Sequence, residues 1–207
     1  MKNNDNGNKE KINIMTLGRF DVGKTCFIIR FTQNTFKDTI ITTGIDLITT
    51  NIKLNNEKAY QVNIYDTAGQ EKYKSMSTNT IKSADGILLM YDITNQKSFD
   101  LIDEWMKSIH EIKGDNFPII LIGNKTDLND LRVISKEEGE ELSLKYKLKF
   151  FETSNKDGTN IKDAALALIN LIIEKQEKEK NELLKDYETK KLDKNIIKKK
   201  KIHHCPC

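Results

Sequence analysis

A short segment near the start of the chain has the residue types and spacing of a phosphate-binding loop. Residues 18–25 read Gly-Arg-Phe-Asp-Val-Gly-Lys-Thr, which matches the pattern G-x-x-x-x-G-K-[ST]. Glycine lets backbone N–H groups approach phosphate oxygens where a Cβ would obstruct them, and the first turn of a helix presents further N–H groups to an anion. Because residues 11–17 read as a strand and residues 26–30 as a helix, we predict a nucleotide-binding loop between them.

Two side chains at the end of this loop have separate expected roles. The amine of Lys24 should reach the β- and γ-phosphates, and the hydroxyl of Thr25 should bind Mg²⁺. The loop predicts a bound nucleotide but not which one. The residues expected to contact that nucleotide here are Gly18, Asp21, Val22, Gly23, Lys24, Thr25 and Cys26.

A second polar segment, Asp66-Thr-Ala-Gly-Gln-Glu71, follows a predicted strand. The carboxylate of Asp66 can hold Mg²⁺ directly or through its water, and Gly69 lets a backbone N–H approach the γ-phosphate. The side chain of Gln70 can orient an attacking water. Taken alone, this segment could also be a polar turn capped by an aspartate.

Two more polar segments follow strands, and the first indicates the base. In Asn124-Lys-Thr-Asp127, the carboxylate of Asp127 can accept hydrogen bonds from N1–H and the 2-amino group of guanine. Adenine lacks this pair of donors, so a site built on it rejects adenine strongly. A helix cap in a loop is the alternative for this motif alone.

The second of these segments, Glu152-Thr-Ser-Asn-Lys156, ends the last predicted strand. Its backbone and Ser154 could support the edge of the base. The aliphatic stems of Lys125 and Lys156 could cover the faces of the base.

The elements that must position these loops alternate between strands and helices. Strands are expected at residues 11–17, 47–54, 60–65, 86–91, 118–123 and 149–152, and helices at 98–112, at 135–146 and from 161 onward. The runs 86–91 and 118–123 are continuously apolar, which is typical of parallel strands covered on both faces. We therefore predict an α/β fold of the P-loop NTPase class: a six-stranded, mostly parallel sheet with helices on both faces and ligands at the carboxyl ends of the strands.

The charge of the chain is unevenly distributed. Its net charge is +3, yet residues 190–207 carry seven lysines and one aspartate. The body is therefore mildly acidic, which argues against a general nucleic-acid binder. Residues 1–10 are polar, so no signal peptide is expected, and every apolar run is too short to span a bilayer. We expect a disordered segment at 1–10, a folded domain at 11–175, and a charged tail at 176–207 in which a fraying helix gives way to flexible chain.

The order of these loops resembles that of the Ras-like small GTPases over roughly residues 11–175, and within that superfamily the chain resembles the Rab family. The segments that carry the resemblance are Thr25-Cys26 with Arg30-Phe31, Gly44-Ile-Asp46, Asp66–Glu71, Tyr91-Asp-Ile-Thr94 with Ser98-Phe99, and a Cys-x-Cys end. The resemblance implies a switch that cycles between GDP and GTP and hydrolyses GTP. Two loops, about residues 34–48 and 66–83, would order around the γ-phosphate and Mg²⁺.

The resemblance also implies roles for individual residues. Gln70 and Lys24 would serve catalysis, and Gly69 would contact the γ-phosphate. Phe36 would lie against the guanine. The threonine that completes the Mg²⁺ shell beside Thr25 and Asp66 is Thr43 when counted from Phe36, which we favour, or Thr42 when aligned on Gly44–Asp46. The residues implied at the base are Asn124, Lys125, Asp127, Ser154, Asn155 and Lys156.

The chain departs from the family pattern at several positions. Phe20 and Asp21 stand where small residues are usual, and the bulk of Phe20 near Gln70 could exclude an arginine finger, so we expect slow hydrolysis. Asn155 replaces an alanine, with only modest effects expected because its backbone N–H can still serve. The usual aromatic triad of the effector face is replaced by Leu47, Tyr65 and Thr80, so effector choice should be unusual.

The end of the chain, Lys198–Lys201 followed by His-His-Cys-Pro-Cys207, has three interpretations. Metal binding by His203, His204, Cys205 and Cys207 would strain a tetrahedral shell, because four ligands fall within five residues. A solvated charged end is the plainest interpretation. Resemblance to Rab tails implies geranylgeranyl groups on Cys205 and Cys207, which we favour. Two lipid chains and a basic run would anchor the protein to an anionic membrane surface.

We therefore expect a GTP-hydrolysing switch of intracellular vesicle traffic, lipid-anchored to the cytoplasmic face of a membrane and with a cytosolic pool. By resemblance its partners would be an exchange factor, a GTPase activator, effectors and a prenyl-binding chaperone, and the chain would be monomeric and bind no nucleic acid. The alternative is a hydrolysis-impaired docking scaffold that binds GTP, since Gln70 favours the first function and Phe20 the second. A P-loop ATPase or nucleoside kinase is opposed by Asp127.

Overall fold

The computed structural model describes residues 9–36, 45–54, 58–67 and 74–202, and the chain divides into two compact units, residues 1–170 and 171–207. In the described residues, six strands form one sheet in the order β2-β3-β1-β4-β5-β6. The sheet is parallel except for the antiparallel pair of β2 and β3. This confirms the predicted mostly parallel sheet. The strands are β1 (Glu10–Leu17), β2 (Ile45–Lys53), β3 (Ala59–Thr67), β4 (Gly86–Asp92), β5 (Ile119–Asn124) and β6 (Lys149–Thr153).

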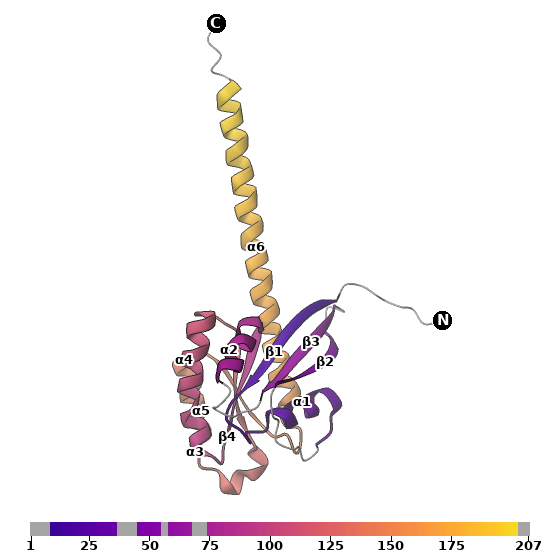
Figure 1. The fold of residues 1–207 in the computed structure, drawn as a ribbon, viewed down its shortest axis with the longest axis vertical. Helices are drawn as coiled ribbons and strands as arrows, with labels where there is room; N and C mark the ends of the chain where they lie inside the picture. Colours follow the sequence, from indigo (N-terminus) through magenta and orange to yellow (C-terminus); the bar gives the residue numbers. More distant parts are fainter. Residues whose placement is uncertain (1–8, 37–44, 55–57, 68–73, 203–207) are drawn as a thin grey trace, which may run out of the picture. The chain divides into compact units, whose positions relative to one another are not determined.

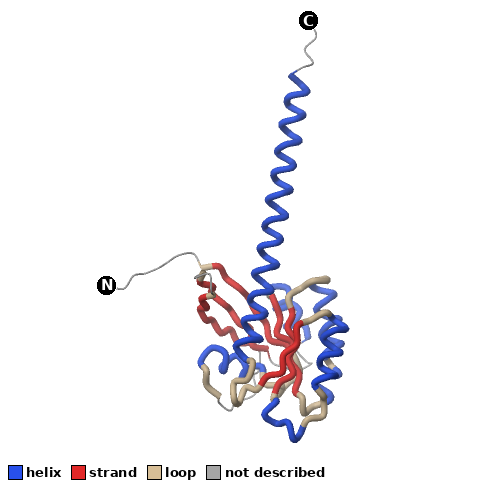
Figure 2. Tube along the Cα trace, turned by 180° about the vertical axis from the view of Figure 1, so that it is seen from behind, coloured by secondary structure: helices blue, strands red, loops and turns tan. Residues whose placement is uncertain are grey.

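The helices lie on both sides of the sheet, which forms a central layer (Figure 2). They are α1 (Lys24–Gln33), α2 (Lys74–Ser83), α3 (Gln96–Asp100), α4 (Ile102–Lys113), α5 (Lys136–Tyr146) and α6 (Ile161–Ile202), with a 3₁₀ helix η2 at Thr126–Leu131. Helices α2, α4 and α5 lie together along one side of the sheet (Figure 1).

The two faces of the sheet follow from strand alternation. On β4, Ile87, Leu89 and Tyr91 point into a core shared with α2, α4 and α5, whereas Leu88 and Met90 are buried on the opposite face. Helix α1 packs against β3, and the first turns of α6 bury an apolar stripe that includes Ile161, Leu168 and Ile169. Strands buried on both faces read as continuous apolar runs, as expected.

Four element boundaries differ from the sequence prediction. The predicted loop at 66–83 contains α2, a polar segment that is fixed as a helix by the burial of Ile81 rather than by propensity. The helix expected at 98–112 is divided into α3 and α4 at Leu101, and β2 begins at Ile45, inside the loop expected at 34–48. The fourth difference is that α6 remains helical to Ile202, whereas we expected it to fray beyond Glu174. The part of α6 beyond Glu174 stays helical because it is rich in good helix formers and carries i,i+4 ion pairs such as Lys175–Glu179 at 3.8 Å.

Helix α5 begins with a capping box formed by Ser135 and Glu138. Ser135 Oγ accepts a hydrogen bond from the backbone N–H of Glu138 at 3.1 Å, and the Glu138 carboxylate accepts one from the Ser135 N–H at 2.8 Å. Ser135→Ala should therefore lower the free energy of unfolding by about 1 kcal/mol. Ser108→Ala, which removes a side-chain bond inside α4, should change it by less than about 0.5 kcal/mol. Urea denaturation checks both; equal losses would contradict the capping role.

Candidate functional site

The phosphate-binding loop lies between β1 and α1, and its two glycines make room for neighbouring strand ends. A Cβ on Gly18 would lie 2.1 Å from the carbonyl oxygen of Met90 on β4. A Cβ on Gly23 would lie 2.6 Å from the amide nitrogens of both Asn124 and Asn155. Gly23 also has a φ of 92°, which other residues rarely adopt. These glycines are therefore needed for the packing of the loop as well as for access to phosphate.

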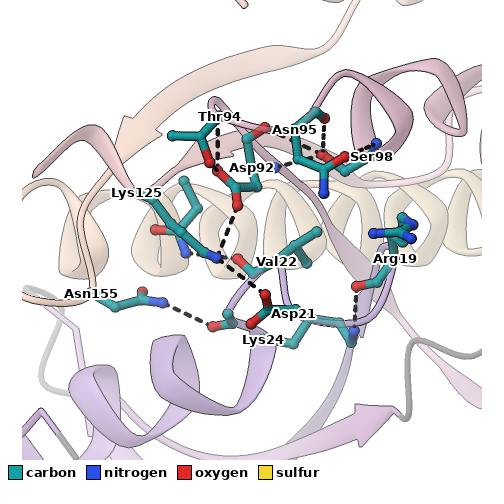
Figure 3. A network of polar contacts seen from close by, with 12 residues as sticks. Arg19, Asp21, Val22, Lys24, Asp92, Thr94, Asn95, Ser98, Lys125 and Asn155 are labelled. Atoms are coloured by element: carbon teal, nitrogen blue, oxygen red, sulfur yellow. Dashed lines mark hydrogen bonds and ion pairs between the residues drawn. The ribbon is translucent and has the colours of Figure 1, made fainter. Parts of the chain in front are cut away.

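Lys24 is the first residue of α1 and only 5% of its surface is exposed. Its amine donates to the carbonyl oxygens of Gly18 at 3.1 Å and Arg19 at 3.0 Å, which holds the cation inside the loop (Figure 3). Burial lowers the pKa of Lys24 to about 8, although the carboxylate of Asp66 acts in the opposite direction. A desolvated cation gains more from an anion than an exposed one does, so this position fits a phosphate.

The predicted Mg²⁺ ligands Thr25 and Asp66 are brought into contact. The Thr25 hydroxyl donates to Asp66 Oδ2 at 2.6 Å, and Asp66, at the end of β3, is buried. The hydroxyl of Thr16 lies 3.4 Å from Asp66 Oδ1. Hydroxyl and carboxylate oxygens beside a phosphate loop match the preference of Mg²⁺ for oxygen ligands, so the donor set fits this ion.

Asn124 joins the end of β5 to the phosphate loop. Its amide nitrogen donates to the carbonyl oxygen of Val22 at 2.8 Å, and its amide oxygen accepts from the hydroxyl of Thr153 at 3.0 Å. The residue is fully buried. Since both ends of the amide are used within the protein, the described contacts make Asn124 a structural link between loops.

Asp127 and Ser154 form the part of the site that fits a guanine edge. The Ser154 hydroxyl donates to Asp127 Oδ1 at 2.8 Å, and Asp127 itself is exposed at the surface of η2. Ser154 belongs to the segment 153–158, which we call the base loop. Its turn is closed by the Gly158 N–H, which donates to the Ser154 carbonyl oxygen at 2.9 Å. A carboxylate oriented in this way presents acceptors to a pair of N–H donors.

Lys125 is held over the phosphate loop by two carboxylates. Its amine lies 2.9 Å from Asp92 Oδ2 and 3.8 Å from Asp21 Oδ2 (Figure 3). Asp92 is in turn fixed by the Thr94 N–H and hydroxyl, each 2.8 Å from Asp92 Oδ1. Sequence reasoning missed roles for Asp92 and Thr16. Asp92 carried a signal, because it follows an apolar strand as Asp66 does.

Asn155 makes a contact that an alanine could not make. Its amide nitrogen donates to the Gly23 carbonyl oxygen at 2.9 Å (Figure 3). Its buried amide oxygen has no hydrogen-bond partner in the part of the chain that the structure describes. The base loop is therefore tied to the phosphate loop by a side chain for which sequence reasoning expected only a modest effect.

Other predicted residues are less constrained. Phe36 is 45% exposed and ends a described segment, and Lys156 is exposed, so their stacking on a base stays a prediction. Phe20 is 40% exposed, with the guanidinium carbon of Arg19 4.0 Å from the centre of its ring. Cys26, an expected nucleotide contact on the first turn of α1, is partly exposed. The residues that lie outside the described ranges are Thr42, Thr43, Gly69, Gln70, His203, His204, Cys205 and Cys207.

The depressed pKa of Lys24 predicts a pH-dependent stability in the nucleotide-free protein. The unfolded chain binds the proton more tightly between about pH 8 and 10.5, so the free energy of unfolding should rise with pH across that window. Lys24→Met removes this dependence. In urea after EDTA treatment, it should be more stable than the wild type by about 1–2 kcal/mol at pH 7. About a quarter of that gain should remain at pH 10, because the unfolded lysine still binds part of its proton there.

Lys107→Met provides the control for this experiment, because Lys107 is exposed on α4. Its difference from the wild type should be small and the same at both pH values. A gain in Lys24→Met that was as large at pH 10 as at pH 7 would contradict a burial penalty on the charged amine.

Comparisons with known proteins agree with this site. The family model for the Ras family matches residues 13–174. The chain is 41% identical over 170 residues to the Ras-related protein Rab-8B of Homo sapiens, covering 82% of each chain. It is 42% identical over 166 residues to Rab-8A of Mus musculus, covering 80% of each chain. A match that runs from β1 into α6 includes every described part of the site. The chain therefore belongs to the Rab family of Ras-like small GTPases.

Proposed function

We propose that the protein is a Rab-type switch that binds GTP and GDP, hydrolyses GTP and acts in intracellular membrane traffic. The observation that carries this proposal is the Asp127 carboxylate, oriented by Ser154 at 2.8 Å. It belongs to the same array of loops as the phosphate-binding lysine, because Asn124 bridges to Val22. A guanine nucleotide requires acceptors for the N–H groups of its base and a loop that binds its phosphates, and this array of loops contains both.

The described residues have distinct tasks in this function. Backbone N–H groups of the phosphate loop and the Lys24 amine would bind the phosphates. Thr25 and Asp66 would hold Mg²⁺, which would neutralise phosphate charge. Lys125 is held beside the phosphate loop by Asp92, and its aliphatic stem would cover one face of the base. Thr43, or Thr42, would complete the metal shell, Gly69 would contact the terminal phosphate and Gln70 would orient the attacking water, as the family resemblance implies.

Phe20 is the residue that bears most on the rate of hydrolysis. Its ring is on the surface of the phosphate loop and carries the Arg19 guanidinium on one face. A ring at this position takes up space that an activator's arginine needs beside the γ-phosphate. We expect slow hydrolysis, both intrinsic and stimulated.

The effector face would also be unusual. Leu47 on β2 is 55% exposed and lies opposite Tyr65 on β3. An aliphatic side chain there offers a partner no ring to stack on. Effectors that depend on an aromatic triad would bind weakly. Family membership also suggests three further partners: an exchange factor, a GTPase activator and a prenyl-binding chaperone.

A single set of measurements tests the nucleotide function. Fluorescent GDP bound to the wild type should be displaced by GDP and GTP at far lower concentrations than by ADP or ATP. Single-turnover hydrolysis of GTP should be slow in the wild type, and Phe20→Ser should accelerate it by about tenfold.

Equal hydrolysis rates in the wild type and Phe20→Ser would contradict the inhibitory role of the ring. A wild type that binds GTP and never hydrolyses it, even as Phe20→Ser, would support the docking scaffold instead. Displacement by ATP as readily as by GTP would overturn guanine selection.

We propose that the basic tail, with Cys205 and Cys207, attaches the protein to a membrane. No helix among the described residues is long and apolar enough to cross a bilayer. The tail carries two cysteines beside four consecutive lysines, and two lipid chains with a basic run suffice for stable anchoring. The double variant Cys205→Ser/Cys207→Ser should therefore be released into the soluble fraction.

The tagged full-length chain, followed by microscopy and by fractionation of cell membranes, checks this expectation. The single variants should bind membranes more weakly than the wild type but more strongly than the double variant. Wild-type membrane binding in the double variant would contradict lipid attachment at these cysteines.

A further inference from the structure

Arg30 lies near the C-terminal end of α1 and donates to three backbone carbonyl oxygens. Its Nε lies 2.8 Å from the carbonyl oxygen of Asn155, and one terminal nitrogen donates to the carbonyl oxygen of Lys156. The other terminal nitrogen lies 3.2 Å from the carbonyl oxygen of Asn34. A Cβ on Gly158 would lie 3.8 Å from the Arg30 side chain, so the turn of the base loop passes directly over it.

Helix α1 therefore contributes to both the phosphate side and the base side of the site. Its first turn contains Lys24 and Thr25, the phosphate and metal residues, and Arg30 follows about 9 Å along the axis at 1.5 Å per residue. At the N-terminal end, the Asn155 side chain ties the same base loop to Gly23 (Figure 3). A hydrogen-bonded helix is stiff over this length, so it fixes the separation of the phosphate and base loops.

The chemistry of this contact requires an arginine. Hydrogen bonds from a charged donor are stronger than those between neutral groups, and a planar guanidinium can reach several carbonyl oxygens at once. A lysine offers a point charge on a flexible stem and cannot span the same set. The carbonyl oxygens of Asn155 and Lys156 would otherwise depend on solvent to hold them in place.

We propose that Arg30 is a positioning residue for guanine recognition. By holding the backbone of residues 155 and 156, it keeps Ser154 against Asp127 and so preserves the acceptor pair for the base. It touches no part of the nucleotide. This role presupposes the proposed guanine-nucleotide binding and extends it to the rate of nucleotide release.

The test uses the full chain with Arg30→Gln and Arg30→Lys. Dissociation of fluorescent GDP should be about tenfold faster in Arg30→Gln than in the wild type. The preference for GDP over IDP, which lacks the 2-amino group, should fall about threefold in Arg30→Gln. Arg30→Lys should lie between Arg30→Gln and the wild type in both the rate of GDP dissociation and the preference for GDP over IDP. A purely structural role would lower stability without changing the ratio of the two affinities.

Arg132→Gln is the matched control. Arg132 directly follows η2 and pairs with Glu152 on β6 at 2.5 Å. Its loss should lower stability and leave the preference for GDP over IDP within about twofold of the wild type. An equal fall in Arg132→Gln would show that general destabilisation is responsible and would overturn the assignment.

Unchanged GDP release and base preference in a folded Arg30→Gln would also overturn it. If Arg30→Gln shows no cooperative unfolding, Arg30→Lys carries the same test, and wild-type behaviour in that variant counts against the proposal. A wild type that binds no GDP would count against the proposed function itself, whereas normal binding with unaffected Arg30 variants would count against Arg30 alone.

Discussion

A planar trans peptide turns its carbonyl oxygen and the following N–H in opposite directions, and the nucleotide site depends on this constraint. The amide of Asn124 holds the carbonyl oxygen of Val22, and the amide of Asn155 holds that of Gly23. The N–H groups of Gly23 and Lys24 must then face the other side of the loop, where an anion can bind. Asn124 at the end of β5 and Asn155 in the base loop therefore set the shape of the phosphate loop before any ligand contact is considered.

This arrangement explains why polar and charged side chains are buried at one edge of a hydrophobic sheet. Lys24, Asp66 and Asn124 are all buried, and each has a partner contributed by another element. Buried polar groups are costly unless they are paired, so the loops hold each other in place. Asp92 and Thr16 take part in the same set of contacts, because Asp92 pairs with Lys125 and Thr16 contacts Asp66.

Most of the fold and the core of the site could be predicted from the sequence. Continuous apolar runs identified β4 and β5, the phosphate-loop motif located Lys24, and polar segments at strand ends located Asp66 and Asp127. The sequence could not show α2, because Ile81 makes it helical through packing that no local pattern records. Nor could it show Arg30 or the Asn155 side chain, since their contacts join residues more than 120 positions apart. Long-range hydrogen bonds to backbone carbonyls leave no spacing signature, because any residue supplies the acceptor.

The helix α6 continues without interruption to Ile202, and this changes what the end of the chain can do mechanically. Over residues 171–202 a helix extends about 48 Å at 1.5 Å per residue. A flexible chain of the same length would average about 30 Å between its ends and fluctuate widely. The distance between residue 171 and Ile202 is therefore set by helix length and would change by 1.5 Å with each residue inserted or removed.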